Sequence, residues 1–138
     1  MPPVYRSMKV DGDGTPVVAH DGGSGLGVRC EDVEIDGHGH VGVSKGMSVF
    51  PPGGYRMLPT TMIPATLSDK HGNPGRNRNR RVFAFGAGAF ADGPLDDGLA
   101  LFVDTPHHGH VVPSRTMELA EFRALVERTR DRWEIDEA

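Results

Sequence analysis

Two short apolar segments carry the clearest strand pattern in the chain. Residues 81–85 and 99–103 combine β-branched and aromatic side chains, and a glycine follows the first segment and precedes the second. The second segment has no polar side chain, so we expect it at the centre of a sheet. Weaker patterns predict further strands at residues 4–10, 27–35, 41–43, 47–50 and 110–112.

A helical pattern follows these strands near the C-terminus. Apolar residues recur there at helical spacing, and most charged residues fall on the opposite side. Ser114 or Thr116 can cap the first turn, and Glu118 and Glu121 follow where the helix dipole favours negative charge. The sequence therefore predicts one amphipathic helix that docks on the sheet through Leu119, Phe122, Leu125, Val126 and Trp133.

The predicted elements indicate an α+β domain with a mixed sheet. The length of 138 residues suits a single core, so we expect one domain over residues 1–138. Proline and glycine are concentrated in residues 51–80, which we interpret as a loop-rich insertion with at most one turn of helix near residues 63–67.

Charge and cysteine content narrow the classes of function. The formal net charge is −4, which argues against a general nucleic-acid binder on electrostatic grounds. The single cysteine, Cys30, excludes an internal disulfide, fits a reducing compartment and is expected to be a small buried side chain. No apolar run reaches the length of a membrane span, and no secretory signal core is present, so we expect a cytoplasmic protein that does not bind membranes.

Three polar segments are candidates for chemistry. Residues 76–81 hold four arginines in a loop context, either as a solvated loop or as a clamp for oxyanions. His107, His108 and His110 lie at the edge of a short apolar run, and histidine titrates near neutral pH. We assign no metal site, because short glycine-flanked histidine pairs such as His38 and His40 are common in exposed turns. A phosphate-binding P-loop motif is absent.

The order of three further motifs resembles one known family. Tyr5-Arg6 precedes an Asp-Gly turn at residues 11–12, and Gly46-Met47-Ser48-Val49-Phe50 lies in the middle of the chain. His108 is followed by Pro113 and Met117 just before the final helix. In this order and rough spacing the chain is similar to small effector toxins of bacterial type VI secretion systems whose fold resembles ADP-ribosyltransferases.

The resemblance implies a largely antiparallel split β-sheet and NAD as a substrate. Arg6 would bind a phosphate of NAD, with Lys45 as a second phosphate contact and Tyr5 stacked on an aromatic ring. Ser48, His108 and His110 would be the catalytic residues. Ser48 would hold the nicotinamide ribose, and one histidine would bind a ribose hydroxyl or act as an acid or base. The catalytic glutamate of many ADP-ribosyltransferases has no clear counterpart, since helix position explains Glu118 and Glu121.

The same resemblance implies a cognate immunity protein and a macromolecular target, reached by a secretion system that needs no signal peptide. Two other interpretations remain open. One is a metal-independent ribonuclease toxin that uses the histidines, Lys45 and the arginines of residues 76–81. The other is a non-enzymatic β-rich binding module with an interaction loop at residues 71–81.

Overall fold

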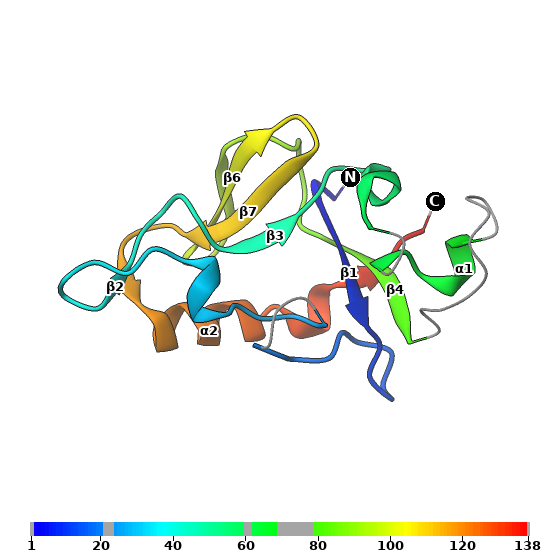
Figure 1. Ribbon diagram of the computed structural model, residues 1–138, viewed down its shortest axis with the longest axis horizontal. Coiled ribbons are helices and arrows are strands. Elements are labelled where there is room, and N and C mark those ends of the chain that lie inside the picture. The colour runs from blue at the N-terminus through cyan, green and yellow to red at the C-terminus, as the bar shows by residue number, and fades with distance from the viewer. Residues whose placement is uncertain (1, 21–23, 60–61, 69–78, 138) are drawn as a thin grey trace.

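Three small sheets and one main helix make up the part of the chain that the computed structural model describes, residues 2–20, 24–59, 62–68 and 79–137 (Figure 1). Neighbouring strands in all three sheets are antiparallel, so the fold is α+β. Within these described ranges, no helix is both long enough and apolar enough to cross a membrane.

The largest sheet contains four strands, in the order β3 (Met47–Val49), β7 (His108–Pro113), β6 (Leu99–Thr105) and β5 (Gly93–Asp96). The second has the order β1 (Val4–Lys9), β4 (Arg80–Phe85) and β9 (Glu134–Ile135). The third pairs β2 (His40–Val41) with β8 (Met117–Glu118). Tyr5 and Phe50 exchange two backbone hydrogen bonds of 2.9 Å, which join β1 to the end of β3.

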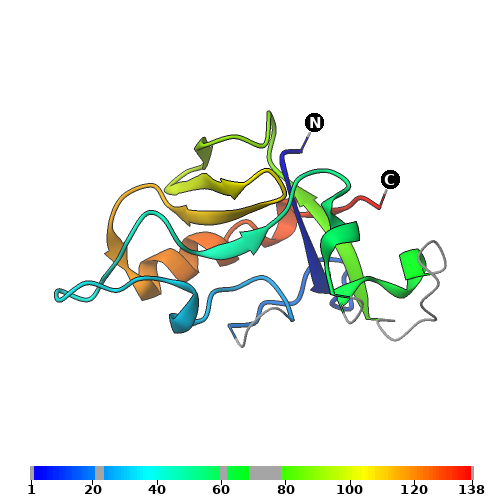
Figure 2. The ribbon, with the colours of Figure 1, turned by 45° about the horizontal axis from the view of Figure 1, so that its top comes forward.

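The main core forms where α2 (Leu119–Glu127) packs against the sheets. Figures 1 and 2 show the helix running beneath β3 and β7. Phe122 and Val126 point from this helix into the core, and both are almost completely buried. They meet apolar residues of several strands, including Met8, Met47, Phe83, Leu101, Val111 and Met117.

A smaller core covers the other face of β1 and β4. Side chains alternate along β1, so Val4 and Met8 face the main core while Tyr5 faces the smaller one. The smaller core is closed by two short helices, the 3-10 helix η2 (Gly54–Met57) and α1 (Ala65–Ser68). Its buried members are Tyr5, Phe50, Tyr55, Ile63, Leu67, Val82 and Ala84. Because both of its faces are covered, β1 is buried except at Lys9.

Most of the predicted strands are confirmed with small shifts of their ends. The two clearest patterns correspond to β4 and β6, and β6 lies between β7 and β5 as its apolar sequence predicted. The strand predicted at residues 110–112 is longer and includes His108. The turn of helix expected near residues 63–67 corresponds to α1, but the limit of one such turn in residues 51–80 is wrong, because η2 is a second short helix there. Residues 60–61 and 69–78, with most of the arginine loop, lie outside the described residues.

The strand predicted at residues 27–35 is wrong, because a short 3-10 helix, η1 (Cys30–Asp32), interrupts it. The Asp32 carboxylate accepts a hydrogen bond from the backbone N–H of Arg29 at 2.9 Å and bonds to the Arg29 guanidinium at 3.0 Å. Such local side-chain bonds compete with strand pairing. Cys30 is exposed on this turn, so the expectation of a buried thiol is also wrong.

The predicted start and end of the C-terminal helix need correction. Ser114 and Thr116 do not cap it, because Met117 and Glu118 form β8 first and the helix begins at Leu119. Trp133 lies beyond its end, where the indole stacks on Phe85 at 5.1 Å and donates a hydrogen bond to Thr129. The apolar spacing of residues 119–126 thus predicted the helix, whereas Trp133 belongs to the chain that returns to β4.

We expect Phe122→Ala to lower the free energy of unfolding by about 3–5 kcal/mol, because the ring is fully buried and its removal leaves a cavity. Urea denaturation followed by circular dichroism measures this change. The matched control is Phe102→Ala. Because Phe102 is only half-buried, this variant should lose clearly less free energy of unfolding than Phe122→Ala. Equal losses in the two variants would contradict the position of the core.

The Asp96–Arg132 ion pair predicts a dependence of stability on pH. Arg132 donates two hydrogen bonds of 2.8 and 2.7 Å to Asp96, and these bonds lower the pKa of the carboxyl. A lowered folded-state pKa stabilises the fold above the ordinary pKa of aspartate, and this stabilisation is lost as pH falls through the folded-state value. Asp96→Asn should lower the free energy of unfolding by about 1 kcal/mol near pH 7. This difference from wild type should vanish on acidification, as Asp96 of the wild type becomes protonated. Urea titrations across this pH range test it, with the more exposed Asp97→Asn as control.

Candidate functional site

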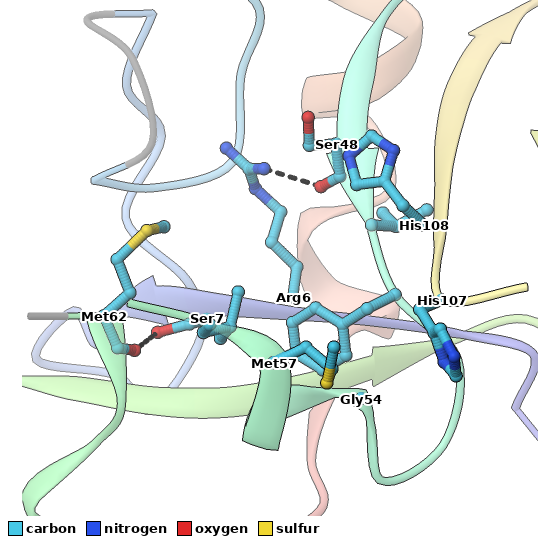
Figure 3. A pocket seen from close by; sticks show the side chains of 11 residues that line it. Arg6, Ser7, Ser48, Gly54, Met57, Met62, His107 and His108 are labelled. Atoms are coloured by element: carbon cyan, nitrogen blue, oxygen red, sulfur yellow. Dashed lines mark hydrogen bonds between the residues drawn. The ribbon is translucent and has the colours of Figure 1, made fainter. Parts of the chain in front are cut away.

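A pocket of about 350 Å³ lies between β1, β3 and the β6–β7 hairpin, with η2 at its side (Figure 3). Most of the surface of its wall is apolar, and polar side chains are inserted into it, which is typical of small-molecule sites. The apolar lining comes from Val49, Phe50, Met57, Leu58 and Met62. The polar and charged side chains of the lining are Arg6, Ser7, Ser48, His107 and His108.

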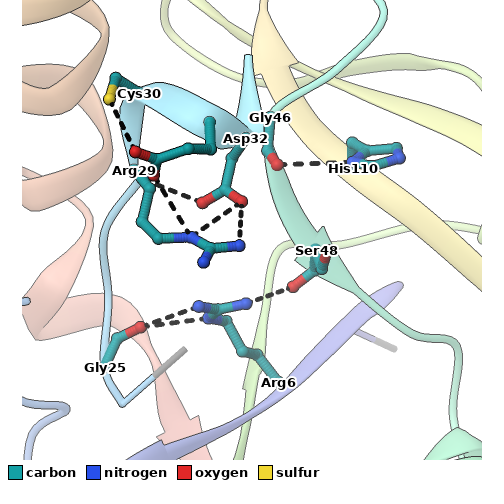
Figure 4. Close-up of polar contacts among 9 residues, drawn as sticks. Arg6, Gly25, Arg29, Cys30, Asp32, Gly46, Ser48 and His110 are labelled. Atoms are coloured by element: carbon teal, nitrogen blue, oxygen red, sulfur yellow. Dashed lines mark hydrogen bonds and ion pairs between the residues drawn. The ribbon is translucent and has the colours of Figure 1, made fainter. Parts of the chain in front are cut away.

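Arg6 brings a buried positive charge to this pocket. Its Nε and Nη2 donate to the Gly25 carbonyl at 3.2 and 3.1 Å, and its Nη1 donates to the Ser48 carbonyl at 2.7 Å (Figure 4). Among the described residues, no carboxylate forms an ion pair with it. Burial lowers the pKa of Arg6 to about 10, so the guanidinium is charged at neutral pH.

Two of the guanidinium N–H groups have no hydrogen-bond partner among the described residues. Arginine has five N–H donors, and three are used in the bonds to Gly25 and Ser48. The loop at Gly25 approaches so closely that a side chain there would bring its Cβ within 2.1 Å of the Val17 carbonyl. Glycine at this position therefore lets the chain deliver its carbonyl to Arg6.

Ser48 and the two histidines share one face of the largest sheet. Ser48 lies opposite His110 in the β3–β7 pairing, and His108 comes two residues before His110 at the start of β7. Side chains at such positions point to the same face of a sheet. Ser48 and His108 both line the pocket, whereas His110 lies beside it. The Ser48 hydroxyl is exposed and has no hydrogen-bond partner among the described residues.

Asp104 joins the two histidines into a cluster that the sequence did not reveal. Its carboxylate lies 2.8 Å from Nδ1 of His108 and 3.1 Å from Nε2 of His110. Partial burial opposes ionisation of Asp104, but the contacts with both histidines outweigh it and lower the pKa. Because Nδ1 of His108 is engaged with Asp104, its Nε2 is the nitrogen left for a ligand in the pocket.

A bulge explains why Asp104 faces this cluster. The pairing of β6 with β7 shifts register between Val103 and Thr105, so Asp104 is an extra residue at the end of the hairpin. Bulges commonly redirect one side chain in this way. The sequence signal that could have found it is the spacing, with an aspartate four residues before His108 across a short turn.

The remaining predicted site residues lie outside the pocket lining. The Tyr5 ring stacks on Phe50 with 6.4 Å between ring centres, and its hydroxyl donates to Asp136. Burial, followed by the bond to Asp136, raises the pKa of Tyr5. Lys45 is half-exposed and pairs with Glu34 at 3.3 Å. The structure therefore brings together Arg6, Ser48 and His108, with His110 next to them.

Comparisons with known proteins do not assign this site. No protein-family model matches the chain. No significant match was found among curated proteins or solved structures.

We expect Arg6→Lys to lower the free energy of unfolding by about 1–3 kcal/mol, although the charge is kept. A lysine ammonium cannot reproduce the planar fork that reaches both the Gly25 and Ser48 carbonyls. Urea denaturation measures the loss, and hydrogen–deuterium exchange should become faster in residues 24–28. The control Arg115→Lys changes an exposed arginine and should be nearly neutral. A lysine variant as stable as wild type would show that the fork does not hold this loop.

Proposed function

We propose that the protein is an antibacterial toxin of the ADP-ribosyltransferase-like class that binds and consumes NAD. One observation carries this proposal. Arg6, Ser48 and His108 belong to three segments far apart in the chain, each from one of the three motifs that resemble the toxin family, and all three line one pocket. The antiparallel sheets, joined at Tyr5 and Phe50, are compatible with the split sheet of that class.

In this proposal the pocket takes the nicotinamide–ribose end of NAD together with a neighbouring phosphate. The volume of about 350 Å³ is at the low end for small-molecule sites, so it suits part of a dinucleotide. The two remaining N–H groups of Arg6 bind the phosphate, because a guanidinium fork matches phosphate oxygens. The apolar wall, including Phe50 and Met62, packs against the uncharged ring of the leaving nicotinamide.

The reacting bond joins the nicotinamide nitrogen to the ribose. Its cleavage releases nicotinamide, and water or a target nucleophile then bonds to the same ribose carbon. Ser48 is exposed at the pocket and binds the ribose through its hydroxyl. His108 accepts a hydrogen bond at Nε2 from a ribose hydroxyl, while its Nδ1–H donates to Asp104.

An immunity protein that blocks this pocket is part of the same proposal. Met57 lies at the pocket with 69% of its surface exposed, which is unusual for a large apolar side chain. Exposed methionine is frequent at protein interfaces. A partner bound over Met57 and His107 would cover the entrance and exclude NAD.

The test is inducible expression in a sensitive bacterium, with growth and cellular NAD followed together. We expect wild type to arrest growth and deplete NAD, and Ser48→Ala and His108→Gln each to slow NAD loss about tenfold or more. Both substitutions affect exposed or half-exposed side chains, so the variants should fold, whereas Arg6→Ala would remove buried hydrogen bonds.

Matched controls are Ser114→Ala and His38→Gln, which alter exposed residues of the same types away from the pocket. Both should remain as toxic as wild type. A soluble, folded wild type that leaves growth unaffected would exclude the toxin. Growth arrest without NAD depletion would exclude rapid NAD consumption and favour slow transfer to a scarce target.

A further inference from the structure

The cluster of Asp104, His108 and His110 has the composition of a metal site. One ligand atom from each side chain lies within 4.8 Å of the other two. Two imidazole nitrogens and one carboxylate oxygen form a ligand set that binds zinc and related divalent transition metals. The geometry points to a site here for a divalent metal ion of the zinc type, with three protein ligands.

The distances are close to those of a loaded site. Zinc bonds to nitrogen and oxygen ligands are about 2.0–2.2 Å long, so neighbouring ligand atoms in a tetrahedron are about 3.3 Å apart. Measured from Oδ2 of Asp104, the nitrogen–oxygen distances are 2.9 Å to Nδ1 of His108 and 3.1 Å to Nε2 of His110. All three ligand atoms lie within 4.8 Å of one another. Small side-chain rotations, which the exposed positions of Asp104 and His108 permit, are therefore enough to admit the ion.

The orientation of His110 suits a metal ligand. Its Nδ1 faces the Gly46 carbonyl at 3.4 Å, as Figure 4 shows, and a carbonyl can only accept a hydrogen bond. In the tautomer that carries its proton on Nδ1, the lone pair of Nε2 points toward the Asp104 carboxylate. Two acceptors then face each other at 3.1 Å, and a metal ion between them removes the repulsion. Metal-binding histidines usually donate their second N–H to such a carbonyl or carboxylate.

The Gly46 carbonyl is fixed in this position by close strand packing. A side chain at residue 46 would place its Cβ 2.0 Å from the Val111 carbonyl, so only glycine fits where the chain enters β3. His110 is held on the neighbouring strand, with only 16% of its side chain exposed. The packing of β3 and β7 therefore positions both the imidazole of His110 and the Gly46 carbonyl that orients it.

The proposed ion would lie beside the pocket, because His108 belongs both to the cluster and to the pocket lining. Three protein ligands leave at least one coordination position for water or a bound molecule. The inference does not depend on the proposed NAD activity, since metal binding is measured without any nucleotide.

Zinc titration of the untagged, metal-free protein by isothermal calorimetry tests the inference near pH 7. The parent for all variants is Cys30→Ser, because the exposed thiol of Cys30 could bind zinc on its own. We expect one zinc ion per chain and a higher melting temperature with excess zinc. Asp104→Asn and His110→Gln should each weaken binding about tenfold or more, as expected for changes at metal ligands.

His107→Gln is the matched control, since this exposed histidine lies in the same hairpin but outside the cluster. It should bind zinc within about twofold of the parent, a change small on the scale of ligand loss. Binding equally strong in the parent and in His110→Gln would overturn the inference and assign the His110–Asp104 contact to a second proton on the imidazole. If His107→Gln weakened zinc binding as much as His110→Gln does, this would also overturn the inference. Zinc would then bind exposed histidines of the hairpin without a defined site.

Discussion

The burial of Arg6 is the constraint on which the pocket depends. A guanidinium removed from water must keep its hydrogen bonds, because an unsatisfied buried charge is very costly. Its three bonds to the Gly25 and Ser48 carbonyls meet this need and draw the loop of residues 24–28 and strand β3 toward β1. Next to this contact, Tyr5 and Phe50 exchange two backbone hydrogen bonds, which fix how β1 aligns with the end of β3. One short strand thus positions two walls of the site.

The sequence predicted the elements whose stability comes from their own apolar pattern. The apolar runs at β4 and β6, and the helical spacing from Leu119 to Val126, correspond to elements of the fold because their apolar side chains are packed in the cores. Those of β4 divide between the main and the smaller core. The short strands β5, β8 and β9 were missed. Each pairs with a partner far away or across a turn, and two to four residues are too few to show a period.

The sequence indicated which residue types could form the site, whereas only the fold shows which of these residues lie close together. The motif order indicated Arg6, Ser48 and His108, which line one pocket. The motif order also indicated Lys45, which does not line the pocket and pairs with Glu34 instead. The direction of a loop decides between these two positions of a lysine, and the sequence pattern does not reveal it. Asp104 was not predicted, since its role arises from a register shift in the β6–β7 hairpin that leaves no apolar pattern.

The charges around the pocket are separated in a way that favours one orientation of a ligand. The cationic Arg6 is buried, so its side of the pocket is the inner end, while the Asp104 carboxylate lies beside the pocket at the exposed end of the hairpin. An anionic group is therefore attracted to the inner end and repelled from the hairpin end, and the effect is strong inside because a buried charge is poorly screened. A cation bound at Asp104 would reverse the repulsion at the hairpin end.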